Sequence, residues 1–358
     1  MQQLLVVHSS KTISGGEVVS INIHKKLKDL FNFSFFIPSS AESAQINIKD
    51  GALFFSKKNN ILSIISGFKR TVRETNPCIV HAHGIRATFI VKLFLLFNKK
   101  KFVFLYTIHG FHIAHKRGFK NKIIKIFEKI TNHLFVNKII CVGKDEYNLV
   151  RKMSINKNKV AIISNGIDEP GKMSDEEIEN FCKNYDYNLV TVCRLHYQKD
   201  VETLIAAVKE LPKNISLTII GSGPLEFKLK QLAKGHKNIL FTHKDGASNL
   251  LHYFDIFILS TNWEGLPLVI LESMLAKIPV IGSNVHGVKE LLEDNNGLLF
   301  KHRNIQDLKN KIIWLIENKD KKIEMINRAY GNAINNYSID QMTKKYKNLY
   351  QSYENPPN

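Results

Sequence analysis

Short apolar runs recur along the chain and alternate with segments of helical spacing. In the first half, runs that predict buried strands cover 4–7, 33–37, 78–81, 102–106, 139–142 and 160–163. In the second half, such runs cover 189–193, 216–220, 238–241, 255–259 and 278–282. Strands that alternate with helical segments, such as 18–30 and 201–211, predict parallel sheets wrapped by helices. The expected fold class is α/β, with two doubly wound Rossmann-like domains facing a cleft.

A break in this alternation divides the chain. Between residues 168 and 187 a Pro-Gly turn is followed by an acidic segment, and we place the interdomain connection there. The first domain is therefore expected over 1–168 and the second over 188–337. A further helical pattern over 338–353 opens with Ser338, which suits an N-cap position.

The composition indicates a globular protein. The chain has 358 residues, of which 44% are hydrophobic and 23% charged, enough to form two cores. Its N-terminus lacks the basic segment and long apolar run of a signal peptide. The longest later apolar run, 89–97, contains Lys92 and is far shorter than the roughly 20 residues of a membrane-spanning helix. We therefore expect a cytoplasmic protein. Its four cysteines lack metal-binding spacing, so neither a disulfide nor a zinc site is expected.

Nearly all of the net charge of +19 lies in the first half of the chain. Residues 1–168 carry 27 Lys and Arg against 9 Asp and Glu, whereas 169–358 carry 24 against 23. This asymmetry favours an anionic partner for the first half, such as nucleic acid, anionic lipid headgroups or a polyanionic substrate. The alternative is a lysine-rich surface that is merely solvated.

One segment of the basic half has an amphipathic pattern. Helical spacing over 116–130 places four apolar residues on one face: Ile123, Ile126, Phe127 and Ile130. The opposite face carries Lys122, Lys125 and Lys129. Such a helix can lie on a membrane surface or pack on its own domain. We expect it to pack through its apolar face, with the lysines still able to meet anionic headgroups.

The loop after the strand at 255–259 carries the clearest candidate chemistry. It contains Glu264, Gly265, Leu266, Pro267 and Leu268, and Glu272 follows in the next helix. Pro267 suits the first helical position, and amide groups at a helix start bind anions. Glu264 and Glu272 can accept hydrogen bonds from the hydroxyls of a sugar and a ribose. Alternatively, the two carboxylates only favour the positive end of the helix dipole.

Two cations follow a neighbouring strand. Arg194 and Lys199 lie between the strand at 189–193 and the helix at 201–211, at the strand end where open α/β sheets bind ligands. A single cation in such a loop is typical of a solvated surface. Two cations beside an anion-binding helix end favour a phosphate ligand.

The first half has weaker signals. Gly15 and Gly16 lie in the loop after the first strand, where glycine either lets a ligand approach the backbone or simply forms a turn. His81, His83 and His109 lie at or just past strand ends, and for each a structural role is the alternative to a catalytic one.

Taken together, these motifs resemble those of the family-4 retaining glycosyltransferases of GT-B fold. The resemblance rests on Glu-x7-Glu at Glu264 and Glu272, on Arg-x4-Lys at Arg194 and Lys199, and on 219–224 between them. It extends in the same order through Ser14–Glu17, 80–84, 107–110 and 164–168, and so covers nearly the whole length. The sequence departs from the family pattern at Cys193, Asp200 and His243, where glycine is common, and these changes alter the shape of the loops.

The resemblance implies a role for each domain. The first domain would bind the acceptor, the second would bind a nucleotide-sugar, and the terminal helix would cross back onto the first domain. Glu264 would orient the donor sugar, Glu272 would bind the ribose, and His109 would reach the transferred sugar. Gly15 and Gly16 are also expected at the donor.

The expected reaction is a metal-independent sugar transfer with retention of configuration. Arg194, Lys199 and the amides from Leu266 to Leu268 are placed to stabilise the leaving phosphate, and the chain contains no Asp-x-Asp. The nucleotide-sugar, which we expect to be a UDP-sugar, is a substrate, and no cofactor is expected. The acceptor is expected to be a lipid-linked glycan at the inner membrane face, in bacterial surface polysaccharide synthesis.

Two other classes of protein remain open. A GT-B-fold sugar-nucleotide epimerase would share the phosphate site but would need no basic surface for a lipid acceptor. A nucleic-acid-binding protein would explain the charge, but interleaved aromatic and basic residues, zinc fingers and RNP motifs are absent. Salt-sensitive binding to anionic liposomes, as against DNA, distinguishes the three classes.

Overall fold

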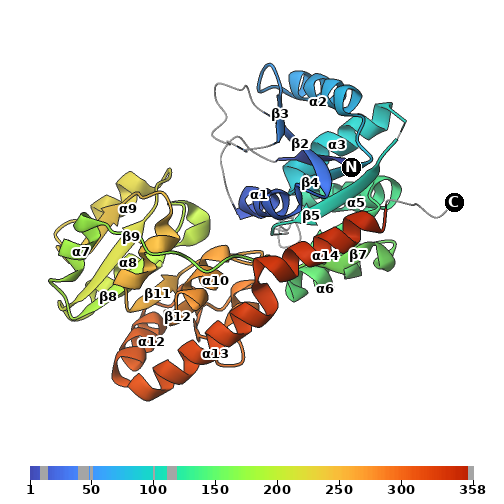
Figure 1. Ribbon diagram of the computed structural model, residues 1–358. Helices are drawn as coiled ribbons and strands as arrows, with labels where there is room; N and C mark the ends of the chain where they lie inside the picture. The colour runs from blue at the N-terminus through green and yellow to red at the C-terminus, as the bar shows by residue number, and fades with distance from the viewer. Residues whose placement is uncertain (9–14, 39–47, 49–50, 100, 111–118, 354–358) are drawn as a thin grey trace. The chain divides into compact units, whose positions relative to one another are not determined.

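The chain forms two compact units. The computed structural model describes residues 1–8, 15–38, 48, 51–99, 101–110 and 119–353. One unit comprises Met1–Gly166 with Ile339–Asn358, and the other comprises Ile167–Ser338. Each is built on a parallel sheet wrapped by helices, so the predicted fold class is confirmed (Figure 1). The segment that the sequence suggests as the connection belongs to the second unit, where α7 (Glu176–Cys182) packs against the 3-10 helix η4 (Ala247–Tyr253).

Within the described residues, the first unit contains a seven-stranded parallel sheet of order β3-β2-β1-β4-β5-β6-β7. Its strands are β1 (Gln2–Val7), β2 (Phe31–Ile37), β3 (Ala52–Phe55), β4 (Ile79–His83), β5 (Val103–Ile108), β6 (Lys138–Cys141) and β7 (Val160–Ile162). Its helices are α1 (Gly15–Leu27), α2 (Ile61–Thr75), α3 (Ile85–Phe97), α5 (Phe119–Phe135), α6 (Lys144–Met153), η2 (Lys157–Lys159) and α14 (Ile339–Gln351). The strand order reverses between β1 and β4, and ligands of such sheets bind beyond the carboxyl ends of the strands at that point.

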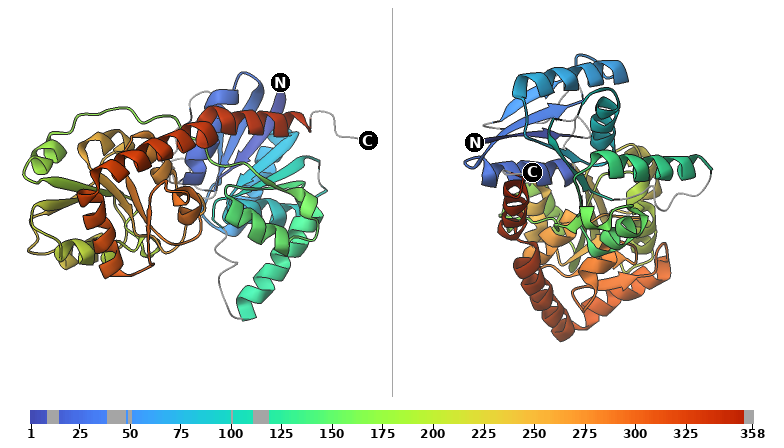
Figure 2. Two further views of the ribbon diagram at one scale, coloured as in Figure 1. Left: turned by 90° about the horizontal axis from the view of Figure 1, so that it is seen from below. Right: turned by 90° about the vertical axis from the view of Figure 1, so that its right-hand side faces the viewer.

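The C-terminal helix α14 packs on the first unit, as the sequence predicts (Figures 1 and 2). The hydroxyl of Tyr350 lies 2.8 Å from Nδ1 of His81, a residue inside β4. The hydroxyl of Tyr346 lies 3.2 Å from that of Thr107, which in turn lies 2.7 Å from Nε2 of His81. Both nitrogens of His81 are therefore used to hold the terminal helix against the sheet.

The second unit contains, in the described part of the chain, a six-stranded parallel sheet of order β10-β9-β8-β11-β12-β13. Its strands are β8 (Tyr187–Val192), β9 (Ile215–Ile220), β10 (Ile239–Thr242), β11 (Ile256–Leu259), β12 (Val280–Ser283) and β13 (Leu298–Phe300). Besides α7 and η4, its helices are η3 (Tyr197–Lys199), α8 (Val201–Lys209), α9 (Glu226–Leu232), α10 (Leu268–Leu275), α11 (Val288–Leu292), α12 (Ile305–Glu317) and α13 (Lys319–Tyr337). Here the order reverses between β8 and β11.

Three local expectations were incomplete or wrong. The edge strands β3 and β13 were not predicted from the sequence: β3 has no fully buried residue, and β13 has only three residues, one of them buried. Gly15 and Gly16 begin α1 instead of lying in the preceding loop, while Ser14 of the same motif lies outside the described residues. Pro267 is the N-cap of α10, one residue before the helical position predicted for it.

The predicted orientation of α5 was also wrong. Ile123, Ile126 and Ile130 were expected to pack on the domain, but their side chains are 53%, 51% and 48% exposed. The helix packs instead through a face that contains Glu128, whose carboxylate lies 2.8 Å from the fully buried ammonium of Lys92 in α3. Because an unpaired buried charge is costly, this ion pair sets the rotation of the helix. Residues 116–118 of the predicted segment lie outside the described residues.

Candidate functional site

In the second unit, the loops after the neighbouring strands β8 and β11 are joined by hydrogen bonds. The amide of Asn262 and the hydroxyl of Thr261 both donate to the carbonyl oxygen of Gln198, at 2.7 and 2.9 Å. The side chain of Asn262 donates to the carbonyl of Tyr197 at 2.7 Å. The loop of Arg194 and Lys199 and the loop of Glu264 therefore form one rigid edge at the point where strand order reverses.

Lys199 and Glu264 form an ion pair across these loops. Nζ of Lys199 lies 2.6 Å from Oε1 of Glu264, and the two side chains are only 17% and 9% exposed. Burial lowers the pKa of Lys199, but the adjacent carboxylate outweighs burial, so that pKa stays above its usual value. The side-chain Nε2 of Gln198 donates to the carbonyl oxygen of Trp263 at 2.8 Å and lies 3.4 Å from Oε2 of Glu264. Both partners are thus charged and held in place.

Arg194 is exposed, and its guanidinium makes no hydrogen bond or ion pair within the described residues. The segment after β9 packs against the Arg194 loop. The amide of Leu195 donates to the carbonyl of Ser222 at 2.9 Å. A side chain at Gly221 or Gly223 would collide with the carbonyl oxygen of Cys193 or Leu195, respectively. The glycines of this segment therefore shape the Arg194 loop, which leaves the guanidinium available for a ligand.

Helix α10 opens beside the ion pair. The loop residues Gly265 and Leu266 lead to Pro267, after which the amides of Leu268 and Val269 form the first turn. Gly287, at the start of α11, packs directly on this loop: its φ is +78°, and a Cβ there would collide with the carbonyl oxygen of Gly265. The sequence analysis missed Gly287, whose only signal is a glycine immediately before a short helix.

Glu272 lies in the second turn of α10 and is half-buried. Within the described residues its carboxylate has no hydrogen-bond or ion-pair partner. Burial raises its pKa to about 7. Since hydroxyl groups that donate to a carboxylate favour its ionised form, this side chain is suited to accept hydrogen bonds from a ligand.

The first unit brings two of the predicted histidines together. Nδ1 of His83, at the end of β4, lies 3.0 Å from Nε2 of His109, which follows β5. Gly16 lies against the same ring, because a Cβ on Gly16 would be only 2.9 Å from Cδ2 of His109. The glycine in the first turn of α1 is thus required to make room for the imidazole of His109.

Burial determines the charge of these rings. It lowers the pKa of His109 to about 4, although the carboxylate of Glu17 acts in the opposite direction. It also lowers the pKa of His83 well below its usual value. Nε2 of His83 is buried and has no hydrogen-bond partner among the residues that the structure describes, and an unpaired buried N–H is rarer than an unpaired acceptor. We therefore assign the proton of His83 to Nδ1, so that it donates to Nε2 of His109 and leaves His109 protonated on Nδ1.

Two family models match successive parts of the chain. Residues 13–169 match the model described as Glycosyltransferase Family 4, and residues 173–332 match the model described as Glycosyl transferases group 1. The chain is a family-4 glycosyltransferase. This confirms the resemblance that the motifs indicate.

Relatives and solved structures agree with this membership. The glycosyltransferase is 28% identical to the O-antigen biosynthesis glycosyltransferase WbnH of Escherichia coli, over 78% of each chain. It is 23% identical to the UDP-Gal:alpha-D-GlcNAc-diphosphoundecaprenol alpha-1,3-galactosyltransferase of E. coli, over 88% of this chain and 83% of that protein. The structure of Anabaena HepE in complex with UDP-glucose matches with a TM-score of 0.84 at 17% identity, over 98% of this chain and 100% of that one. The fold is GT-B.

The predicted site residues of this glycosyltransferase fall into two groups. Those on the second unit lie on adjoining loops and on α10: Arg194, Lys199, Glu264, Gly265, Leu266, Pro267, Leu268 and Glu272. Those on the first unit gather where α1 begins and β5 ends: Gly15, Gly16 and His109.

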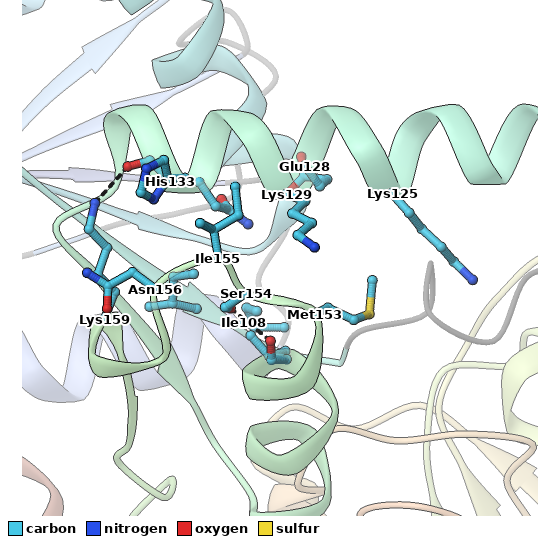
Figure 3. Close-up of a pocket in the computed structure, with 13 residues that line it drawn as sticks. Ile108, Lys125, Glu128, Lys129, His133, Met153, Ser154, Ile155, Asn156 and Lys159 are labelled. Carbon is cyan, nitrogen blue, oxygen red and sulfur yellow. Dashed lines mark hydrogen bonds between the residues drawn. The ribbon is translucent and has the colours of Figure 1, made fainter.

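The glycosyltransferase also has a pocket that no motif indicated. It lies between α5 and the segment after α6 and is open to solvent, with about 450 Å³ of empty space of which part is bulk solvent. Figure 3 shows Lys125, Glu128, Lys129 and His133 along one helix above Met153 and Ile155. Among the described residues that line it, Ile108 alone belongs to a motif segment, 107–110, and none is a predicted site residue.

Proposed function

We propose that this glycosyltransferase transfers a sugar from a UDP-sugar to a lipid-linked glycan in the synthesis of bacterial surface polysaccharide. The observation that carries the proposal is the charged pair of Lys199 and Glu264 beside the start of α10, with the unpartnered carboxylate of Glu272 one turn further on. This arrangement offers a cation and amides to a diphosphate, and two carboxylates to hydroxyl groups. The names of the relatives support the same choice: one acts in O-antigen synthesis, one uses UDP-galactose and a diphosphoundecaprenol-linked sugar, and HepE binds UDP-glucose.

We assign a role at the donor site to the predicted site residues of the second unit. Arg194 and Lys199 neutralise the diphosphate, together with the amides from Leu266 to Leu268 at the positive end of α10. Glu264 orients the donor sugar through its hydroxyls, and Glu272 accepts hydrogen bonds from the ribose.

In the first unit, His109 contacts the transferred sugar. With its proton on Nδ1, and with its pKa near 4, the neutral ring donates one hydrogen bond to a sugar hydroxyl without adding a positive charge. Gly15 and Gly16 carry no side chain and so allow the donor to approach the first amides of α1.

The transfer itself retains configuration and uses no metal ion. The bond between the anomeric carbon and the phosphate oxygen breaks, and negative charge develops on the departing UDP. Arg194 and Lys199 stabilise that charge. The acceptor hydroxyl attacks the same face of the sugar, and its proton passes to the leaving phosphate, so no separate carboxylate base is needed.

The acceptor is held at the membrane. The first unit contains nearly all of the net positive charge of the chain, and anionic lipid headgroups attract such a surface. The enzyme then acts as a peripheral protein at the inner face of the membrane, with no nucleic-acid partner.

Calorimetric titration with UDP-, GDP- and ADP-sugars in the presence of EDTA tests the donor site. We expect the wild type to bind UDP-sugars, and Glu272→Ala to lose about 10-fold or more of that affinity, because the carboxylate proposed to accept hydrogen bonds from the ribose is removed. Glu324→Ala, which removes an exposed carboxylate from α13, is the matched control and retains binding. Absence of binding by the wild type, or equal effects of the two substitutions, would contradict the proposal.

A further inference from the structure

Helix α5 carries an apolar stripe that nothing in the described part of the chain covers. Ile123, Ile126, Ile130 and Leu134 are 53%, 51%, 48% and 62% exposed. Their spacing of three, four and four residues places them on one side of the helix. Four large aliphatic side chains in a row are more than the scattered single apolar residues that a protein surface normally shows.

Lysines border this stripe. Lys122 and Lys129 are exposed, and Lys125 is half-buried at the pocket beside α5. In Figure 3, Lys125 and Lys129 leave the helix on the side that faces the pocket. On a helical wheel the three lysines lie between the exposed isoleucines and the pocket, so apolar and cationic rows run side by side along the helix.

The neighbouring helix α3 also exposes apolar side chains. It packs beside α5, fixed by the Lys92–Glu128 ion pair. Its residues Phe89, Leu96 and Phe97 are 42%, 48% and 81% exposed. No helix in the described residues has the length and apolar character to cross a bilayer. The exposed apolar side chains therefore form a surface feature and are not part of a membrane-spanning segment.

We propose that α5 docks on an anionic lipid bilayer. The isoleucines enter the boundary between headgroups and acyl chains, while the lysines meet the lipid phosphates. Charge complementarity selects this occupant, because two copies of the face would bring two lysine rows together, whereas an anionic bilayer offers opposite charge and an apolar interior at once. The inference rests on the proposed function for its biological setting, and it names the surface through which the acceptor is reached.

Flotation with phosphatidylcholine vesicles, with and without phosphatidylglycerol, tests the apolar row. The wild type is expected to float with the phosphatidylglycerol vesicles. Ile123→Ser combined with Ile130→Ser is expected to lower the partition coefficient by about tenfold or more, since each buried isoleucine contributes to insertion. Ile323→Ser combined with Ile334→Ser, which changes two exposed isoleucines of α13, is the matched control and is expected to float like the wild type.

The cationic row has its own control. Lys122→Gln with Lys129→Gln removes two charges from α5, whereas Lys57→Gln with Lys58→Gln removes the same charge from an exposed loop of the same unit. If docking occurs through α5, the first pair reduces vesicle binding more than the second, and the difference shrinks at high salt. Equal effects of the two pairs would contradict docking through α5 and leave only attraction by the overall charge of the unit.

Three results would overturn the proposal. The wild type could fail to bind anionic vesicles, the Ile123/Ile130 variant could float like the wild type, or that variant could convert a dimer into a monomer on a sizing column. The last result would assign the face to contact between copies. Calorimetry of nucleotide-sugar binding on the same proteins separates the docking surface from the proposed function. If the wild type binds no nucleotide-sugar, the proposed function is contradicted. If donor binding is normal but the wild type fails to float with anionic vesicles, only the docking surface is contradicted.

Discussion

The ammonium of Lys199 and the carboxylate of Glu264 lie 2.6 Å apart. The cation that we assign to the phosphate and the carboxylate that we assign to the sugar therefore hold each other in position. Such pairing reduces the cost of ordering both side chains when the donor arrives. It also keeps Lys199 charged despite its burial.

Replacing Lys199 with Met separates these two effects. The substitution leaves Glu264 without its cation, so we expect lower thermal stability and a donor affinity reduced by about 10-fold to 100-fold. Adding Glu264→Gln removes the unpaired charge. We expect it to restore much of the stability but none of the donor affinity, as measured by thermal unfolding and calorimetry. Recovery of donor affinity in the double variant would mean that Lys199 only neutralises Glu264.

Glu272 predicts a pH effect on donor binding. With its pKa raised to about 7, the carboxylate is partly protonated at neutral pH. Ribose hydroxyls that donate to the ionised form lower that pKa, so binding releases a proton, and affinity rises with pH until it levels off above about 7. Calorimetry near pH 7 in buffers of different ionisation enthalpy measures the release directly. Glu272→Gln is expected to abolish it, and proton uptake by the wild type would contradict the assigned contact.

Gly16 predicts an effect on His109. In Gly16→Ala the new methyl group would meet the His109 ring at 2.9 Å and displace it, and we expect kcat to fall by about 10-fold to 100-fold with little loss of stability. Gly331→Ala is the control, because Gly331 lies within α13 and has no atom within 4 Å of the added methyl. That change is expected to raise stability by roughly 0.5–1 kcal/mol and to leave kcat unchanged. Equal activities of the two variants would argue against a role for His109.

The buried ion pair that orients α5 predicts an asymmetry in stability. Lys92→Met leaves Glu128 buried without its cation and is expected to cost about 3–5 kcal/mol in the free energy of unfolding. Lys92→Met with Glu128→Leu removes both charges, and most of that loss should be recovered. Denaturant unfolding of the three proteins measures the difference. A double variant as unstable as the single one would show that packing around Lys92, and not charge, is what the site requires.

Much of the fold follows from local sequence signals. Strands buried on both faces of a parallel sheet form continuous apolar runs, which is why β1, β2, β8 and β9 are visible in the sequence. The position of the candidate site follows from one general rule, since ligands bind where strand order reverses. The sequence alone places Arg194 and Glu264 in loops after two predicted strands, at the carboxyl ends where open α/β sheets bind ligands.

Other features depend on contacts that no local pattern encodes. The pairing of Lys199 with Glu264 arises only when β8 and β11 become neighbours. In the sequence, Lys92 interrupts an apolar run. In the structure it is the buried ion-pair partner of Glu128 in α5. Asp200 illustrates a cost that the sequence hides. Its φ of 44° lies in the left-handed region that favours glycine, the residue common at this position in the family. The backbone of Asp200 is therefore strained, and a 2.8 Å hydrogen bond from the hydroxyl of Thr203 to its carboxylate helps to stabilise it.

The most direct test of the account is a transfer assay. The purified glycosyltransferase is incubated with radiolabelled UDP-sugars and a bacterial membrane extract in EDTA, and label in the butanol-soluble lipid fraction is counted. We predict transfer from one UDP-sugar by the wild type and by Glu324→Ala, and a loss of at least about 100-fold in Lys199→Met and Glu272→Ala, since we propose that both residues contact the donor. Absence of lipid-bound label with every UDP-sugar, or full transfer by both donor-site variants, would contradict the central claim.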